Sequence, residues 1–243
     1  MGSSANPQSK SETVADLRQR MAAVKARGVE DRSSVPDWST RAMLPIPAAI
    51  AQLLPGRGLA GGTLVDYRGA TSVLLGIAAA TTASGYAALV NMPNASLLAA
   101  VEMGAQLERL PCVTARHEGF VPALGALLDG MALVIADTGN RKLTPTELRG
   151  LRARAHSKGC TLILSGAYHH VGADLRIVSR VIAVDGLGAG SGRVTSTRIA
   201  IHATAKFGTG EGQVQLAGRV GRVEWTSYTD PTTDVAVFAT DAG

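Results

Sequence analysis

The chain has 243 residues, of which 46% are hydrophobic but only 4% are aromatic. This length and composition predict one sizeable α/β domain with short extensions and a core of Ala, Val and Leu. Apolar stretches are too short to span a bilayer, and the two cysteines are isolated, so we expect a cytoplasmic protein with no membrane partner and no metal centre. The formal net charge is +5, and residues 141–229 hold 13 Lys/Arg against 5 Asp/Glu. That excess fits either a surface for nucleic acid or an acidic partner, or an ordinary solvated face.

Residues 1–43 are expected to form a disordered start, one amphipathic helix at 11–27 and a linker that contains Pro36. The helix carries one narrow apolar stripe, which must pack on something because a lone helix of this length is marginal in water. Either it packs on its own domain or it docks on a neighbouring subunit or partner. The stripe consists of Val14, Leu17, Met21 and Val24.

From Leu44 onward, segments of strand and helix character alternate, which predicts a doubly wound, mostly parallel sheet. Expected strands cover 63–68, 86–90, 133–136 and 161–164, and expected helices cover 46–54, 72–84, 96–110, 121–129 and 145–158. The helix at 96–110 would bury an apolar face made by Leu97, Leu98, Val101, Leu107 and Leu110. The helix at 145–158 begins with a capping box, Thr144 to Glu147, with Pro145 at its first position.

The pattern changes after Leu175. Residues 177–184 and 193–203 predict an antiparallel hairpin joined by a glycine-rich loop, and 213–216 and 222–226 predict further short strands. Residues 44–224 would thus form the core, followed by a flexible acidic tail at 225–243. The tail is either a frayed terminus or a docking segment for a partner, whose anchors would be Trp225, Tyr228, Val235 and Phe238.

The strand at 63–68 runs into Gly69-Ala70-Thr71-Ser72 and then into an apolar helix. This is the frame of a phosphate-binding P-loop, whose working form is G-x-x-x-x-G-K-[ST]. Here the loop is shorter and has no Lys. The frame therefore predicts neither a nucleotide cofactor nor a catalytic residue.

The segment order resembles the ATPase core of RecA recombinase, with corresponding runs at 59–69, 85–90 and 131–137. The resemblance implies a RecA-like core in which Asp137 holds the Walker B-like position. Asn91-Met92-Pro93-Asn94 stands where RecA would place the carboxylate that activates water, and neither Asn nor Met can serve as that base. We therefore expect Asp137 to cap the following turn instead. RecA has two DNA-binding loops, and the resemblance implies that residues 165–172 are all that remains of the second one. We therefore do not expect this protein to carry out strand exchange.

More closely, the chain is similar to the actinobacterial ImuA-prime proteins. This likeness is carried by Leu44-Pro45-Ile46-Pro47, by the lysine-less turn at 68–72 and by the glycine-rich hairpin segment at 186–193. The resemblance implies a non-catalytic, nucleoid-associated adaptor of a DNA damage-induced mutagenic translesion system. Its partners would be an inactive Y-family polymerase homologue and, through it, an error-prone C-family polymerase.

Two rival functions remain. One is a regulator that binds single-stranded DNA or RecA filaments through cationic side chains, for which the candidates are Arg149, Arg152, Arg154, Lys158, Arg193 and Arg198. The other is a residual nucleotide-binding ATPase. His169 and His170 are expected in a surface loop, because adjacent side chains diverge and no Cys or carboxylate cluster accompanies them.

Overall fold

The computed structural model describes residues 42–188, 191–219 and 221–229. All of these belong to one compact unit, Arg41–Gly243. The helix predicted at 11–27, with its four stripe residues, lies outside the described residues, as do Val235 and Phe238 of the predicted tail.

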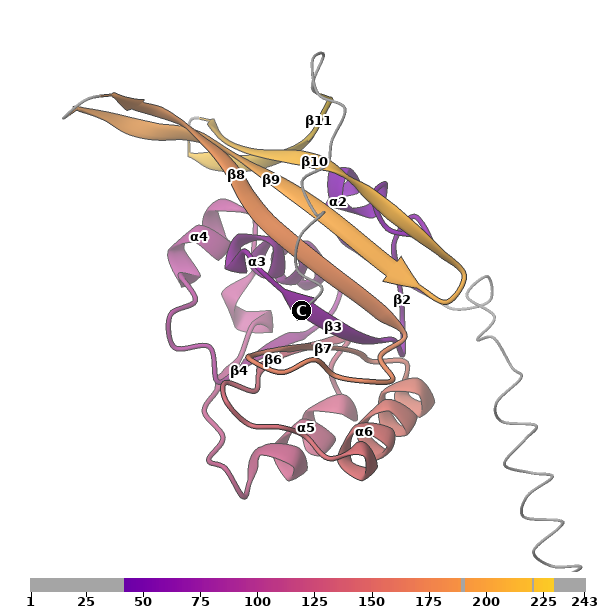
Figure 1. Cartoon of the computed structure of the whole chain (residues 1–243). Coiled ribbons are helices and arrows are strands. Elements are labelled where there is room, and N and C mark those ends of the chain that lie inside the picture. The colour runs from indigo at the N-terminus through magenta and orange to yellow at the C-terminus, as the bar shows by residue number, and fades with distance from the viewer. Residues whose placement is uncertain (1–41, 189–190, 220, 230–243) are drawn as a thin grey trace, which may run out of the picture. The chain divides into compact units, whose positions relative to one another are not determined.

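Within the described residues, nine strands form one sheet in the order β11-β10-β9-β8-β3-β7-β6-β4-β5 (Figure 1). A separate two-stranded sheet joins β1 (Met43–Leu44) to β2 (Leu59–Ala60). The half of the large sheet from β8 to β5 is parallel, and the half from β8 to β11 is antiparallel. The expected mixed α/β architecture is therefore present.

The parallel half follows the predicted alternation of strands and helices. Its strands are β3 (Leu64–Arg68), β4 (Ala87–Val90), β5 (Cys112–Val113), β6 (Leu133–Asp137) and β7 (Thr161–Ser165). All are short, and β3, β4, β6 and β7 are mostly apolar and buried on both faces, as strands of a helix-covered parallel sheet must be, whereas β5 at the edge is partly exposed. The carboxyl ends of β3, β4, β6 and β7 meet at one edge, where ligand sites of such sheets normally lie.

Two layers of helices cover this half. One face packs against α2 (Ala48–Ala51), α3 (Thr71–Thr82) and α4 (Leu97–Glu102), and the other against α5 (Phe120–Leu128) and α6 (Pro145–Lys158). The first cluster extends under the antiparallel strands through Ile199, Ile201 and Val214. The second cluster contains no residue of those strands. On the face of the sheet that α5 and α6 cover in the parallel half, the antiparallel strands therefore do not contribute to the helical hydrophobic core.

The antiparallel half is larger than the sequence predicts. It consists of β8 (Leu175–Gly188), β9 (Ser191–Ala205), β10 (Gly208–Arg219) and β11 (Arg222–Tyr228). The predicted hairpin is present, but its strands continue through the expected glycine loop as far as Gly188 and Ser191. Bulges near Val181 and Asp185 absorb the extra residues, which is how long hairpins bend and twist.

The single helix expected at 96–110 is wrong. Helix α4 ends at Glu102, and a short 3-10 helix, η2 (Leu107–Arg109), follows it. Gly104 between them has a φ of +95°, which a helix cannot accommodate. Since the two pieces point differently, Leu97, Leu98, Val101 and Leu107 are exposed, while Ala100 and Leu110 are buried.

The tail does not begin at Trp225 as expected, because Trp225 and Tyr228 lie within β11. The Trp225 ring packs on α3 so closely that a Cβ at Gly76 would stand 2.6 Å from its Nε1. Residue Leu216 of β10 faces Trp225 across the sheet. Pairing with β10 determines that residues 222–228 form a strand, although their local sequence is polar.

Candidate functional site

The turn after β3 lies where a P-loop would hold phosphate. Gly69 has a φ of +122°, and a Cβ there would lie 1.8 Å from the carbonyl oxygen of Ser179 on β8. The amide of Ala70 donates to Ser179 Oγ at 2.9 Å. Tyr67 donates its buried hydroxyl to the Ala70 carbonyl at 2.6 Å and lies 2.6 Å from Ser179 Oγ. The Ala70 amide is therefore bound by Ser179 of β8, and the Ala70 carbonyl by Tyr67 of β3.

A pocket of about 360 Å³ lies beside this turn at the carboxyl ends of the parallel strands. Its walls include Arg68, Thr71, Leu74, Met92, Asp137 and Ser165. Asn91 bonds both ways to Ala115, with its Nδ2 donating to the carbonyl at 3.0 Å and its Oδ1 accepting from the amide at 2.8 Å. Asn91 thus fastens the loop after β5, and apolar Met92 occupies the pocket wall.

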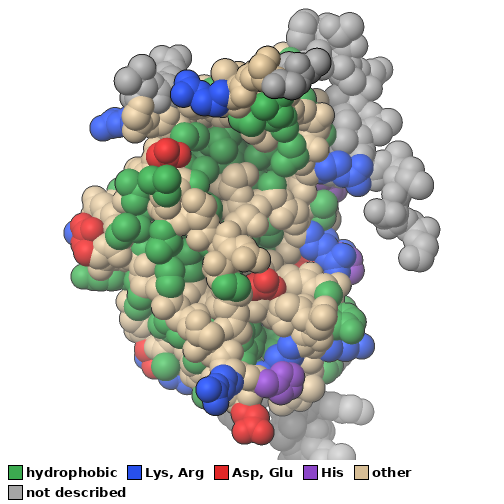
Figure 2. Space-filling model, turned by 90° about the vertical axis from the view of Figure 1, so that its left-hand side faces the viewer, with side chains coloured by type: hydrophobic (Ala, Val, Ile, Leu, Met, Phe, Trp, Pro, Cys, Tyr) green, Lys and Arg blue, Asp and Glu red, His purple; other side chains and the backbone are tan. Residues whose placement is uncertain are grey.

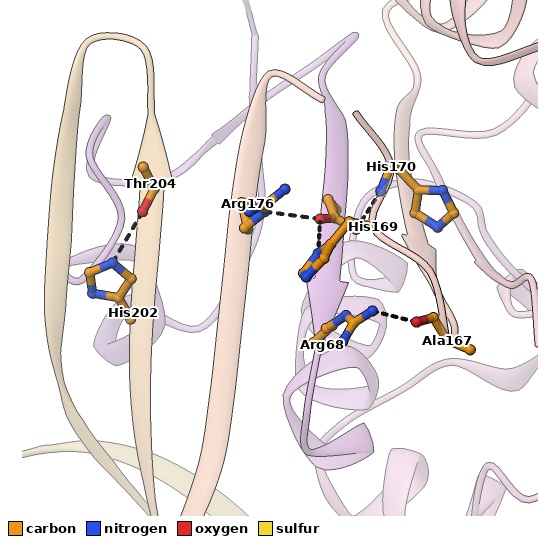
Figure 3. Close-up of polar contacts among 8 residues, drawn as sticks. Arg68, Ala167, His169, His170, Arg176, His202 and Thr204 are labelled. Carbon is orange, nitrogen blue, oxygen red and sulfur yellow. Dashed lines mark hydrogen bonds and ion pairs between the residues drawn. The ribbon is translucent and has the colours of Figure 1, made fainter. Parts of the chain in front are cut away.

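Asp137 ends β6 and lines the same pocket. Its Oδ1 accepts a hydrogen bond from the amide of Gly139 at 2.8 Å. This is the turn-capping contact that the sequence predicts for a Walker B-like aspartate without a phosphate cradle. Arg68 turns its guanidinium to the carbonyl of Ala167 in the loop after β7 (Figure 3).

The cationic candidates on α6 are mostly paired with carboxylates. Arg152 pairs with Asp174, while Arg154 and Lys158 both approach Asp129. The Arg154 hydrogen bond lowers the pKa of Asp129, so the carboxylate stays charged. Arg149 is exposed and has no partner among the described residues. Because three of the four cationic candidates on α6 are paired, this helix offers less unpaired positive charge than its number of Lys and Arg residues implies.

The hairpin candidates differ from each other. Arg193 is exposed near the tip of the hairpin, whereas Arg198 lies across the sheet against Tyr228. The Arg198 guanidinium carbon stands 5.0 Å from the Tyr228 ring centroid, and its Nη1 donates to the Tyr228 hydroxyl at 3.1 Å. Tyr228 therefore belongs to the sheet surface and Trp225 to the core, so neither is available as part of a tail.

The structure reveals a buried charge cluster that the sequence does not single out. The Asp66 side chain on β3 is only 1% exposed. Its Oδ2 accepts from Arg176 Nε at 3.0 Å and lies 3.2 Å from His169 Nδ1, while its Oδ1 accepts from the amide of His170 at 3.3 Å. Figure 3 shows Arg176 approaching from β8 and His169 from the loop over β3. A buried carboxylate needs such partners, because desolvation alone would be costly.

His170 corrects the surface-loop expectation for the histidine pair. His169 is about half exposed, but His170 is only 2% exposed, and its buried Nε2 has no hydrogen-bond partner among the described residues. Burial lowers the pKa of His170, so it is neutral at physiological pH. The cue in the sequence was Asp66 itself, a charged residue between the buried Val65 and Tyr67.

Within residues 42–188, 191–219 and 221–229, no group of three or more His, Cys, Asp or Glu side chains is arranged to hold a metal ion. In the same part of the chain, no helix has the length and apolar character needed to cross a bilayer.

Fold and site together define an α/β protein that has the strand-turn-helix frame of a phosphate-binding site but lacks its lysine, and the Ala70 amide of the turn is already bound to Ser179. The chain matches the MT3502 N-terminal domain family over residues 52–171. It is 36% identical over 165 residues to the uncharacterized protein Rv3395c of Mycobacterium tuberculosis. The aligned region covers 65% of this chain and 78% of that relative. The chain belongs to the family of this mycobacterial protein.

Proposed function

We propose that the protein is a non-catalytic, RecA-like adaptor of the ImuA-prime type in a DNA damage-induced mutagenic translesion complex. Its partners would be an inactive Y-family polymerase homologue and, indirectly, an error-prone C-family polymerase. The observation that carries the proposal is the closed turn after β3. The strand-turn-helix frame is present, yet the Ala70 amide is bound to Ser179 and the turn contains no lysine. A frame kept without its chemistry is suited to presenting surfaces.

One surface suits protein docking. Leu97, Leu98 and Val101 of α4 are 39%, 70% and 44% exposed. On the same side of the sheet, β8 presents Val181 and Val184, which are 46% and 43% exposed. We call these five residues the apolar surface. Figure 2 shows hydrophobic side chains gathered over this side of the molecule. Grouped exposure of this kind is typical of interaction sites.

The register explains why these residues share a side. Val184 pairs with Thr197, Thr197 with Leu216, and Leu216 with Trp225. Residues paired across a sheet point to the same face. Since Trp225 packs on α3, Val184 also points toward the side that holds α3 and α4.

Co-purification with the polymerase homologue tests this proposal. We expect Leu98→Asp to weaken the complex at least about tenfold in Kd, since burying one leucine contributes about 1.5–3 kcal/mol. The matched control is Val171→Asp, because Val171 is 82% exposed but lies in the loop before β8, outside the apolar surface. A truncation should remove only residues 230–243, because deletion from Trp225 would also remove β11 and its packing on α3. Failure of the unmodified full-length chain to bind would contradict the adaptor proposal.

A further inference from the structure

One face of the antiparallel half is polar and carries a row of cations. Arg176 faces Thr204 across the sheet, Val178 faces His202, and Arg180 faces Ala200. Asp66 and Arg68 of β3 lie opposite Arg176 and Val178, so they continue the same side. We call this side the polar face; its cationic and aromatic members are Arg68, Arg176, Arg180, Arg198, His202, Arg222 and Tyr228. It is the side whose helical cluster does not reach the antiparallel strands.

Asp66 holds one donor group of this face, the Arg176 guanidinium, in a fixed position. Arg176 contacts Asp66 only through Nε, which leaves its two terminal nitrogens without a partner among the described residues. The side chain is 46% exposed, so this free end of the fork reaches the surface. His169 contacts Asp66 through Nδ1, and when that nitrogen carries the proton of the neutral ring, Nε2 is an acceptor, so His169 is not counted among the donors for an anion. A guanidinium oriented by a buried carboxylate, as Arg176 is, is arranged for an anion before it arrives.

A pocket of about 360 Å³ adjoins Arg176 at the start of β8. Its walls include His170, Arg176, Thr204 and Lys206. Asp174 also lines it, but its oxygens are occupied by the Leu64 amide at 3.0 Å and by Arg152. The unpartnered His170 Nε2 is buried beside this pocket. The free polar groups here are cationic or neutral, which suits a phosphate group.

The remaining charges extend the site along the sheet. Arg180 stands about 13 Å from Arg176 along β8, since a strand rises about 3.3 Å per residue. It is exposed and has no partner among the described residues. The acids of this face are engaged: Asp185 accepts from Ser196 at 2.6 Å, Glu211 lies 3.4 Å from His202, and Glu224, which the register places on the same side, is not free either. Free cations thus outnumber free carboxylates, and they are spread over a length that one small anion could not cover.

We infer that the polar face binds the phosphodiester backbone of a single-stranded nucleic acid, with one phosphate seated between Arg176 and Lys206. A single strand fits better than a duplex, because this face is a sheet surface from which no described helix projects into a groove. Tyr228 offers an aromatic ring on the same face, and single-strand sites combine a cationic track with aromatic side chains. The inference is independent of the protein docking proposed above, which uses the opposite side of the sheet.

Fluorescence anisotropy of the full-length chain with fluorescein-labelled oligo(dT) tests this inference. We expect Arg180→Glu combined with Lys206→Glu to weaken binding at least about tenfold at about 50 mM salt. The matched control is Arg116→Glu, an exposed cation in the loop after β5 without a described partner, which should change binding less than about twofold. In a salt series, Arg180→Ala with Lys206→Ala should reduce the slope of log K against log salt by about 1.4, or 0.7 per phosphate contact.

Four results would overturn the inference. The first is no binding by the unmodified chain at low salt. The second is an equal loss with Arg149→Glu, which would place the nucleic acid on α6. The third is displacement of the oligonucleotide by inorganic phosphate or ATP at the same phosphate concentration, which would assign the pocket to free phosphate groups. The fourth is loss of binding when residues 230–243 are removed. This acidic segment contains no Lys or Arg, so its removal should not weaken binding to phosphates. Thermal unfolding of each variant separates lost contacts from lost folding.

Discussion

At the scale of single residues, the turn after β3 shows how a phosphate cradle is closed from within. Tyr67 is 1% exposed, and burial raises the pKa of its hydroxyl. The hydroxyl therefore keeps its proton and donates a hydrogen bond to the Ala70 carbonyl. The Ser179 hydroxyl can then donate to Tyr67 while it accepts from the Ala70 amide. Every polar group of this small network is satisfied, and such networks are rigid when complete. An amide held in this way is not available to a nucleotide phosphate.

Gly69→Ala tests how tightly the turn closes. We expect a loss of about 3 kcal/mol in the free energy of unfolding, because the new methyl group would collide with Ser179 in addition to straining the positive φ. Gly139→Ala is the matched control: its φ is +54°, but a Cβ there meets nothing within 4 Å, so only about 1–2 kcal/mol of backbone strain should appear. Urea unfolding measures both variants. Equal losses would mean that Ser179 moves aside and the turn is not closed.

At the scale of elements, local signals in the sequence predict the parallel half well. The capping box of α6 is present, with Thr144 Oγ1 accepting from the Glu147 amide at 3.2 Å and Glu147 accepting from the Thr144 amide at 2.7 Å. Its residues Leu148, Leu151 and Ala155, which the helical spacing of three and four places on one side, are all buried. These features depend on neighbours within one or two turns of the chain, which is why composition and spacing reveal them.

Features that depend on distant partners could not be predicted. Asp66 meets His169 and Arg176, which are 103 and 110 positions away, so its role is invisible in the local sequence. Strand β11 is polar by composition, yet its pairing with β10 places Trp225 in the core. In the 96–110 segment the hydrophobic spacing favoured one helix, and the single residue Gly104 divided it. Pairing and backbone geometry overrode propensity in each case.

The cap of α6 gives a prediction at this scale. Thr144→Ala should reduce the free energy of unfolding by about 1 kcal/mol, because the Glu147 amide loses its acceptor and the Glu147 carboxylate loses a donor hydroxyl. The hydrogen bonds from Thr144 also hold the pKa of Glu147 below its usual value, so that pKa should rise in the variant. Urea unfolding and NMR titration measure the two effects. Thr146→Ala, an exposed position in the same first turn, should change stability by less than about 0.5 kcal/mol.

At the scale of the whole unit, β8 joins the two halves of the sheet. It pairs in parallel with β3 and antiparallel with β9, and its Leu175 and Ile177 lie in the same hydrophobic cluster as α3 and Ile199. The two faces around this strand then differ in character. The side of α3 and α4 presents the apolar surface, and the opposite side presents the polar face. Protein docking and nucleic-acid binding would therefore not compete for the same residues.

Because β8 belongs to both halves, we expect the parallel core and the antiparallel extension to unfold together. The chain has two tryptophans, so in a Trp38→Phe variant the fluorescence reports only on Trp225, which links β11 to α3. Urea titrations followed by this fluorescence and by far-ultraviolet circular dichroism should give coincident midpoints, as expected of one cooperative unit. The variant's circular dichroism midpoint should equal that of the unmodified chain, which checks that Trp38→Phe is harmless. A fluorescence change that completes at lower urea would show that β9–β11 detach first, and that the packing of Trp225 on Gly76 is too weak to hold the extension to the core.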